Sequence, residues 1–392
     1  MTPRIATSFS ALLLAATGLA ETFVVAPFSN RTNDAKLDWI GESISEAIRE
    51  AAEASRLGVV LREDREQAVK RLSLRLSSQL SLASIVKLAE ATSSERAVYG
   101  KFELAPNAAR PASKGSLRIT ARVFDVKKIL QVTEVSALGA IEDLPVLEAD
   151  LAWDLLRALT GREKVARLDL LREHRAVKVN ALEYYVRGLM ATGKWMQHRY
   201  FTQAARLDPK FPHPNFHLGR MQFEDERYRE AAGWLEKVPD DLPYSEEAAF
   251  MLALSRYEIS DYESARKVLE KVEPKLPVPE IWNNLGAALA RLNRPEALTY
   301  FRRAMEADPA DSDYQFNAGY VLWKMRDFAN AADRFRAALD RSPDDQDAIL
   351  LLGKSLASSG PRPGEIRTEG LERLKDSYIE PSKPVESASL AK

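Results

Sequence analysis

Residues 310–343 read ADSDYQFNAGYVLWKMRDFANAADRFRAALDRSP, and this stretch decides the fold of the second half of the chain. The apolar residues before Pro343 keep the spacing of one helix face, namely Ala331, Phe335 and Ala338. Gly319 lies on the preceding run, and a small residue at that place lets two helices approach closely. The stretch therefore predicts two helices that pack against each other.

The same pattern recurs at a regular interval along the chain. Five prolines follow one another at differences of 34, 34, 32 and 34 residues, namely Pro209, Pro243, Pro277, Pro309 and Pro343. A small residue follows most of them at the same distance, as at Gly219, Ala253 and Gly353. A period near 34 residues is typical of stacked helix pairs.

This pattern resembles the tetratricopeptide repeat (TPR), whose unit is two antiparallel helices with small residues at their crossing and a proline in the loop. The resemblance implies an all-α solenoid over residues 180–378, with about five repeats and a capping unit. In the capping unit we expect a first helix that contains Gly353 and a second helix over residues 365–378.

Composition limits the class of protein and of partner. The 392 residues are 45% apolar and 29% charged, as in an ordinary globular protein with two or three domains. Lys and Arg number 56 against 57 Asp and Glu, and the formal net charge is -1 with no basic block, which argues against nucleic acid as a partner. Because the chain has no cysteine, it has no disulfide and no cysteine that could carry a lipid.

The first twenty residues predict export. Arg4 supplies a basic start, residues 11–20 are apolar, and Gly18 and Ala20 are the small residues that a signal peptidase needs before Glu21. The apolar stretch is about half of the roughly 20 residues that a membrane-spanning helix needs. We therefore predict a cleaved signal peptide over 1–20, in preference to an uncleaved anchor. The mature protein is then soluble, periplasmic or secreted, not a lipoprotein, and without a transmembrane span.

Residues 21–160 have a different pattern, which predicts an α+β domain. We expect strands over 22–27, 57–61, 97–104, 116–125 and 130–140, and helices over 36–55, 63–72, 81–92 and 143–159. In the run 116–125 apolar and polar residues alternate, so one face of that strand is buried and the other is wet. This order of elements implies a mixed sheet covered by helices.

Particular residues in this region resemble the amino-terminal domain of the TolB translocation protein and its FlgO-like and CsgG-like relatives. They are Val24-Val25-Ala26-Pro27-Phe28 with Asn30, Asp38-Trp39-Ile40-Gly41-Glu42, Ala97-Val98-Tyr99-Gly100-Lys101, and Arg118-Ile119-Thr120-Ala121-Arg122-Val123-Phe124-Asp125. The resemblance implies an envelope protein that docks on other proteins and has no known active site. The chain lacks the lipid-bearing cysteine of CsgG-like members, and its loop over 106–115 is long, which argues against pore formation.

Two further segments complete the organisation. Residues 161–179 are charged and helix-prone, and they predict a helix that connects the two domains. Residues 379–392 are rich in Ser, Pro and Lys, and they predict a disordered tail.

The resemblance to TPR proteins places the candidate binding site on the first helices of the repeats, which line a concave groove in that family. The positions expected to face the groove are Phe216, Phe223, Phe250, Tyr257, Asn284, Arg291, Phe316, Asn317, Tyr320, Trp323 and Lys324. Aromatic rings supply contact area at low entropic cost, and asparagine side chains can donate to and accept from a peptide backbone. An extended peptide or a helix would suit this surface. The alternative is that several of these rings pack between adjacent repeats.

Signals for catalysis and for metal or cofactor binding are weak, and we predict no catalytic, cofactor-binding or metal-binding residues. His213 and His217 are four residues apart, but no carboxylate completes a zinc site. Gly353-Lys354-Ser355 lacks the earlier glycine and the preceding strand of a phosphate-binding loop. We therefore predict that the protein is not an enzyme and uses no cofactor.

Three functions remain open from the sequence. The first is a non-enzymatic adaptor or scaffold of the bacterial cell envelope that binds a peptide or helix of an unidentified protein in the groove, with residues 21–160 docking on an envelope complex. The second is a self-associating structural component of an outer-membrane assembly, in which the groove binds another copy or the protein's own termini and a homo-oligomer can form. The third is a small-molecule sensor near Asn30, Arg31 and Asp38.

Overall fold

The computed structural model describes residues 22–55, 57–74, 80–105, 116–160, 177–362 and 364–378. These residues form two compact units, which divide between residues 175 and 176. The predicted signal peptide over 1–20, the loop over 106–115, all but the last residues of the predicted connecting helix and the tail over 379–392 lie outside the described residues.

The amino-terminal unit is a mixed sheet with helices. Its elements are β1 (Phe23–Val25), β2 (Ser29–Asn30), α1 (Trp39–Ala54), α2 (Arg62–Arg71), α3 (Leu82–Ala91), β3 (Arg96–Ala105), β4 (Ser116–Asp125), β5 (Leu130–Ala140) and α4 (Leu144–Thr160). The strand order is β1-β3-β4-β5, and β2 also pairs with β3. Strands β1 and β2 run parallel to β3, whereas β3, β4 and β5 are antiparallel neighbours. The predicted α+β class and mixed sheet are confirmed.

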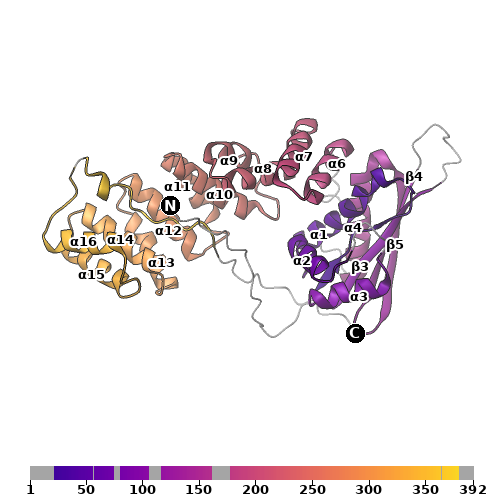
Figure 1. Ribbon diagram of the computed structural model, residues 1–392, viewed down its shortest axis with the longest axis horizontal. Coiled ribbons are helices and arrows are strands. Elements are labelled where there is room, and N and C mark those ends of the chain that lie inside the picture. Colours follow the sequence, from indigo (N-terminus) through magenta and orange to yellow (C-terminus); the bar gives the residue numbers. More distant parts are fainter. Residues whose placement is uncertain are drawn as a thin grey trace. The chain divides into compact units, whose positions relative to one another are not determined.

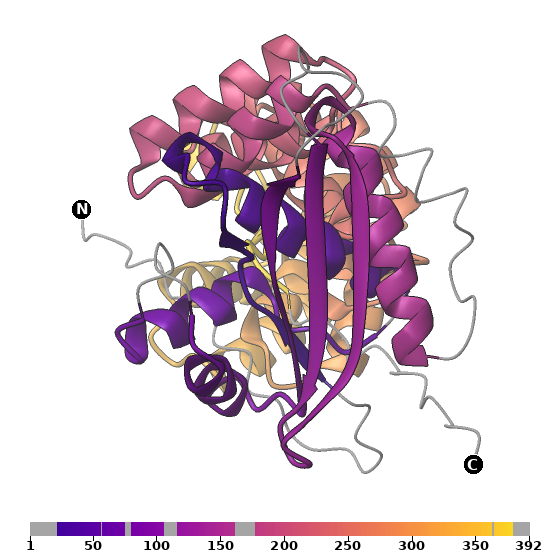
Figure 2. The ribbon, with the colours of Figure 1, turned by 90° about the vertical axis from the view of Figure 1, so that its right-hand side faces the viewer.

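Alternation along β4 separates a buried face of the sheet from a wet one. Leu117, Ile119 and Val123 are fully buried, while Arg118 between them is exposed. Helices α1 and α4 contact each other, and α4 also contacts β4 and β5. Figure 2 shows the long strands side by side with helix α1 behind them. Because only one face needs apolar side chains, the period-two pattern was readable in the sequence.

One predicted strand is wrong. Residues 57–61 form only an isolated bridge between Val59 and Phe23, which is held by two backbone hydrogen bonds of Phe23. Helix α2 begins at Arg62, so the chain turns away before a longer ladder can form. A short strand that was not predicted occurs instead at β2.

A buried ion cluster ties α1 and α2 to the first strand. Arg65 is 2% exposed, pairs with Glu42, and donates to the backbone oxygen of Val25 at 3.0 Å. Arg62 also donates to Glu42, at 2.9 Å. Burial alone would raise the pKa of the Glu42 carboxyl, but the two guanidinium groups lower it, so the carboxylate stays charged.

The second unit is a series of helix pairs. Its helices are α6 (Val179–Met190), α7 (Lys194–Leu207), α8 (His213–Glu224), α9 (Tyr228–Leu235), α10 (Ser245–Glu258), α11 (Tyr262–Val272), α12 (Pro279–Arg291), α13 (Ala297–Ala307), α14 (Ser312–Lys324), α15 (Phe328–Leu339) and α16 (Gln346–Leu356). Each helix contacts the next in order (Figure 1). The helical solenoid predicted for this half of the chain is confirmed.

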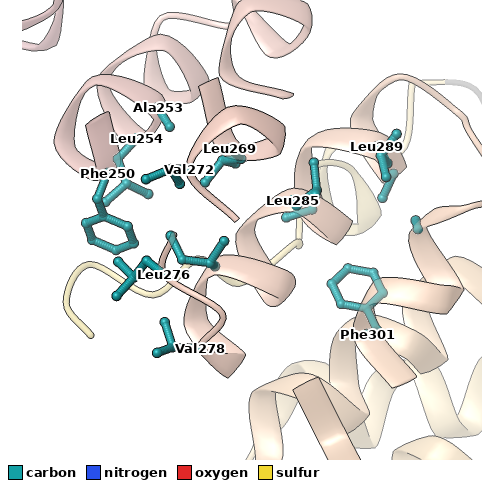
Figure 3. Packing of buried hydrophobic residues seen from close by; sticks show 14 of the residues in the cluster. Phe250, Ala253, Leu254, Leu269, Val272, Leu276, Val278, Leu285, Leu289 and Phe301 are labelled. Carbon is teal, nitrogen blue, oxygen red and sulfur yellow. The ribbon is translucent and has the colours of Figure 1, made fainter. Parts of the chain in front are cut away.

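Glycines on the first helices let the second helices approach. A Cβ atom at Gly286 would lie 2.7 Å from the Phe301 ring, and a Cβ atom at Gly319 would lie 3.0 Å from the Phe335 ring. The core between adjacent repeats is continuous, as Figure 3 shows for residues of α10 to α13 around Leu269. The small residues that mark the period in the sequence are therefore helix crossings.

The predicted second helix of the capping unit, over residues 365–378, is also wrong. After a short 3-10 helix (Ile366–Thr368) the described chain has no regular secondary structure. Gly364 and Gly370 adopt positive φ angles of 78° and 68°, which end helical geometry. Backbone groups that a helix would pair internally are paired with side chains of α12 and α14 instead. The solenoid thus ends on α16 and an irregular segment.

Two glycines at equivalent places in their repeats should respond oppositely to alanine. A methyl group at Gly286 meets the buried Phe301 ring, so Gly286→Ala should lower the unfolding free energy by about 1 kcal/mol in spite of a better helix propensity. Gly353 lies on α16, and a Cβ atom there meets nothing within 4 Å because no second helix covers it. Gly353→Ala should therefore stabilise by up to about 1 kcal/mol. Urea denaturation of both variants would test the pair, and the same sign for both would contradict this packing.

Candidate protein-binding groove

The eleven predicted groove positions lie on four helices, the first helices of their repeats. They are Phe216 and Phe223 on α8, Phe250 and Tyr257 on α10, Asn284 and Arg291 on α12, and Phe316, Asn317, Tyr320, Trp323 and Lys324 on α14. After α16 the chain runs back along these helices, as the yellow trace shows in Figure 1. We call the faces of α10, α12 and α14 and the start of α16 that contact residues 372–378 the groove face, and these residues the groove segment.

Asn317 binds both backbone polar groups of one residue in the groove segment. The backbone N–H of Arg373 donates to Asn317 Oδ1 at 2.8 Å, and Asn317 Nδ2 donates to the backbone oxygen of Arg373 at 2.8 Å. Asn283 Nδ2 donates to the same oxygen, also at 2.8 Å. Asn317 is held in place because its Nδ2 also donates to Asn283 Oδ1.

Asn284 repeats this arrangement two residues further along the segment. The backbone N–H of Lys375 donates to Asn284 Oδ1 at 2.8 Å, and Asn284 Nδ2 donates to the backbone oxygen of Lys375 at 2.8 Å. Asn283 and Asn284 are 0% and 1% exposed, so leaving their amides unpaired would be costly. We call Asn283, Asn284 and Asn317 the asparagine row. Main-chain groups of the groove segment two residues apart face this row, as in an extended chain.

Acidic side chains receive the two basic side chains of the groove segment. Arg373 donates to Asp313 at 3.0 Å and to Asp345 at 2.8 Å. Lys375 Nζ lies 2.6 Å from Asp311 and 2.7 Å from Asp313. Asp311 and Asp345 also cap helices α14 and α16, so their carboxylates are oriented by backbone N–H groups.

Cationic side chains of the groove face bind Glu372, the acidic residue that precedes Arg373 and Lys375 in the groove segment. Glu372 has a side chain that is 1% exposed, and it lies 3.5 Å from Arg291 and 3.6 Å from Lys324. The groove face therefore presents positive charge to Glu372 and negative charge to Arg373 and Lys375.

These charges make docking of the groove segment sensitive to acid. Burial alone would raise the pKa of Asp313 and Asp345. Hydrogen bonds from Lys375 and Arg373 lower the pKa of Asp313 below the ordinary 3.8, and a hydrogen bond from Arg373 lowers the pKa of Asp345 in the same direction. A lowered pKa stabilises docking above 3.8, and this contribution is lost as the pH falls through the docked value. The pKa of Lys375 is raised from 10.5, so its contribution is complete below that value and is lost only as the pH rises further.

Docking is therefore expected to be constant between about pH 5 and 9 and to weaken below about pH 4. Because the chain has no cysteine, Ser377→Cys, an exposed position, can carry a single fluorophore. Its anisotropy should fall on acidification. A constant anisotropy down to about pH 3, with the helical circular dichroism unchanged, would contradict this electrostatic account.

The aromatic positions on α14 belong to the core and also contact the chain that follows α16. Phe316, Tyr320 and Trp323 are at most 2% exposed and form a cluster with residues of α15 and α16. Tyr320 Oη donates to the backbone oxygen of Thr368 at 2.7 Å, and Trp323 Nε1 donates to that of Ser359 at 2.8 Å. The Arg373 guanidinium lies 3.6 Å from the centre of the Phe316 ring. Packing between repeats, the alternative drawn from the sequence, thus applies to these rings.

The positions on α8 and α10 differ in what they contact. Phe250 lies edge-on to Tyr378, with ring centres 5.0 Å apart. Tyr257 packs with Leu374 and Tyr378 around the same apolar cluster. Phe216 stacks on Tyr244 at 4.2 Å, and Phe223 contacts Tyr228 at 5.8 Å, both within their own part of the solenoid.

Sequence reasoning missed the partners that give this surface its chemical character. They are Asn283, Asp311, Asp313 and Asp345 on the groove face. The groove segment was anticipated only in general form, as one of the protein's own termini, and its residues were not identified. The three acids had a signal, because they cluster at the starts of two consecutive first helices, but acidic residues are common at helix starts, where they cap the helix. Nothing local marked residues 372–378 as a ligand of distant asparagines.

Polar residues near the start of the amino-terminal unit pair with one another. Asn30 Nδ2 donates to Asp38 Oδ1 at 2.7 Å and to the backbone oxygen of Asp34 at 2.9 Å. Thr32 donates to Asn30 Oδ1. These contacts organise the turn before α1, which accounts for the polar residues at this place.

His213 and His217 lie in an aromatic cluster with Tyr185 and Phe201. Within the described ranges no group of three or more His, Cys, Asp and Glu side chains could hold a metal ion. Over the same ranges, no helix has the length and apolar character required to cross a membrane.

Comparisons with known proteins found a family model and several relatives that match part of the chain. A family model described as tetratricopeptide repeat matches residues 250–312, 287–345 and 316–361. The chain is 29% identical over 173 residues to the cell division cycle protein 16 homolog of Homo sapiens, covering 44% of this chain and 23% of that protein. It is 27% identical over 169 residues to the peroxisomal targeting signal receptor of Pichia angusta, covering 41% and 30%. The chain thus spans less than a third of the length of these relatives.

Among solved structures, the chain is similar in part to YrrB, a TPR protein with an unusual peptide-binding site, at 21% identity and a TM-score of 0.35, covering 40% of this chain and 82% of that one. MamA 41-end from Desulfovibrio magneticus RS-1 is 22% identical with a TM-score of 0.38, covering 43% and 97%. The family match and the helix pairs described above coincide. Residues 250–361 of the helical unit therefore match the tetratricopeptide repeat.

Proposed function

We propose that this protein is a non-enzymatic adaptor that captures an extended segment of a partner protein on the groove face. One observation carries the proposal. Asn283, Asn284 and Asn317 make five hydrogen bonds to backbone groups of the groove segment. Side chains that bind main-chain groups recognise an outstretched peptide through features that every residue has, so a segment of another protein can make the same bonds.

The surrounding side chains would add specificity to this main-chain recognition. The cations Arg291 and Lys324 and the acids Asp313 and Asp345 lie on either side of the asparagine row, and they select charge at defined positions of a bound segment. Buried aromatic and asparagine side chains around them are held by the solenoid core, which limits the entropy lost on binding.

Capture of a partner from an envelope extract tests this function. The bait is the full chain with Arg373→Glu and Lys375→Glu, whose groove segment should no longer compete, and the matched control carries Asn284→Ala and Asn317→Ala in addition. A crosslinked partner should be lost with the control, and a synthetic peptide of the crosslinked partner segment should bind the first chain only. Undiminished capture by the control would overturn recognition through the asparagine row.

The cellular setting of the adaptor is part of the proposal. Arg4 and the apolar residues 11–20 support export, and the residues that resemble the TolB amino-terminal domain support docking of residues 21–160 on a bacterial envelope complex. Sequencing of the amino terminus of the mature protein should give a start near Glu21. A start at Met1 in the mature protein would overturn export.

A second candidate is self-association, because the groove face accepts a segment of this same chain. If segments were exchanged between copies, each copy would occupy the groove face of another. Light scattering would then show a mass that rises with concentration. A constant monomeric mass would favour the adaptor.

A further inference from the structure

The groove segment pairs with the charged, hydrogen-bonding and apolar groups of the groove face. Charge pairing at Glu372 is followed by main-chain hydrogen bonds at Arg373 and Lys375, whose side chains reach the acids. Leu374 lies between the two basic residues and packs against the apolar cluster formed by α10 to α13. The order along the segment is therefore acid, base, apolar, base.

The chain before the groove segment is attached by other contacts. Ser359 and Thr368 accept hydrogen bonds from Trp323 and Tyr320, and Leu371 packs against the buried cluster of α14 to α16. This part packs against α14 and the cluster that α14 forms with α15 and α16, so it has a structural task. The groove segment, by contrast, is attached largely through polar and ionic contacts, which another peptide of the same chemistry can reproduce.

We propose that the groove face selects extended segments with the pattern Glu-Arg-apolar-Lys, and that residues 372–375 are the chain's own copy of this ligand, which an external segment must displace. The proposal rests on the proposed function and names both its ligand class and its regulation. Because the groove segment is tethered to α16 by a short stretch, its effective concentration is high, of the order of millimolar for such tethers. An external ligand must therefore either bind more tightly than the groove segment or act when that segment is released.

The test uses the full chain and a labelled synthetic peptide of residues 369–378, with the sequence EGLERLKDSY. In one variant, Arg373→Glu and Lys375→Glu place negative charge against Asp311, Asp313 and Asp345 and should release the groove segment. A matched control, Arg373→Lys with Lys375→Arg, keeps both charges and should retain docking. A second peptide carries the same two charge reversals.

The peptide with the native sequence should bind the charge-reversed chain at least tenfold more tightly than the wild type or the charge-conserving control. The charge-reversed peptide should bind none of the three chains. Equal affinity of the native peptide for all three chains would overturn self-occupancy. Equal affinity of both peptides for the charge-reversed chain would overturn the selected pattern.

If the native peptide does not bind the charge-reversed chain, hydrogen exchange at the amides of residues 373 and 375 shows whether the groove segment was released. If these amides have lost protection in the charge-reversed chain but the native peptide still does not bind to it, the proposed ligand class is overturned. Failure of the proposed function is a separate result, because the peptide could bind as expected while no partner protein depends on Asn284 and Asn317. If the wild type forms dimers at high concentration and the charge-reversed chain does not, the groove segment of one copy occupies the groove face of another. That result would overturn occupancy of the groove face by the same chain's segment.

Discussion

Asn317→Ala is expected to release the groove segment while the solenoid stays folded. The change removes two hydrogen bonds to the backbone of Arg373 and one to Asn283, and it leaves polar groups at a site that is 0% exposed in the native protein. A buried hydrogen bond contributes about 1 kcal/mol, and an unpaired buried group costs about 1 to 3 kcal/mol. We therefore expect docking to weaken by about 2 to 3 kcal/mol, or roughly 100-fold.

Hydrogen exchange measured by mass spectrometry reads this change at the groove segment. Protection of the Arg373 and Lys375 amides should fall strongly, because each donates to an asparagine side chain, whereas protection within α12 and α14 should fall little. Asn330→Ala is the matched control. Asn330 contacts Asp327 near the start of α15, away from the groove segment. Retained protection in Asn317→Ala would show that these bonds do not hold the segment.

Glu148→Gln is expected to flatten the pH dependence of stability in the amino-terminal unit. Glu148 lies on α4 and is 2% exposed. Burial raises the pKa of its carboxyl to about 8, and the charge of Glu50 adds to this effect, while Ser43 opposes it. The native unit thus holds a proton that the unfolded chain loses near pH 4.5.

The sign of the effect follows from this difference. A raised pKa of a carboxyl leaves stability complete below about pH 4.5, and stability then falls as the pH rises towards 8, at up to about 1.4 kcal/mol per pH unit. The wild type should therefore lose a few kcal/mol over this range relative to Glu148→Gln, whose amide never ionises.

Amide exchange within α1 and α4, followed in urea between about pH 5 and 8, reads the amino-terminal unit alone. Glu142→Gln is the matched control, because it makes the same change of charge at an exposed position just before α4. The wild type and the control should lose stability in parallel, while Glu148→Gln loses less. Parallel curves for all three proteins would contradict a protonated Glu148.

Much of the fold was readable from local patterns. The alternation in β4 reports core contacts made by every second residue of the strand. The small residues at Gly286 and Gly319 report helix crossings that occur once in each repeat. Such contacts recur at a fixed interval, so periodicity alone reveals them. The strand over 57–61 failed because strand length depends on where the next helix begins, which propensity does not report.

The candidate groove shows the same division. The first helices and the asparagines Asn284 and Asn317 followed from counting along the repeat. Whether a ring such as Phe316 contacts a ligand or the next repeat depends on side-chain packing between helices, and both occur here. Asn283 was not predicted because counting along the repeat placed Asn284, the next residue, at the groove-facing position.

The sequence by itself determined the helix pairs, their period and the mixed sheet, because these arise from short-range periodicity and from small residues at regular crossings. Only the tertiary structure decided the course of residues 365–378, where the sequence predicted a helix. Glycines at 364 and 370 remove the helical preference, and Asn284 and Asn317, 91 and 56 residues away from their partners, supply the hydrogen bonds that a helix would have supplied. Bonds over such separations leave no periodic trace in the sequence, so folding alone reveals that the groove face holds a segment of its own chain.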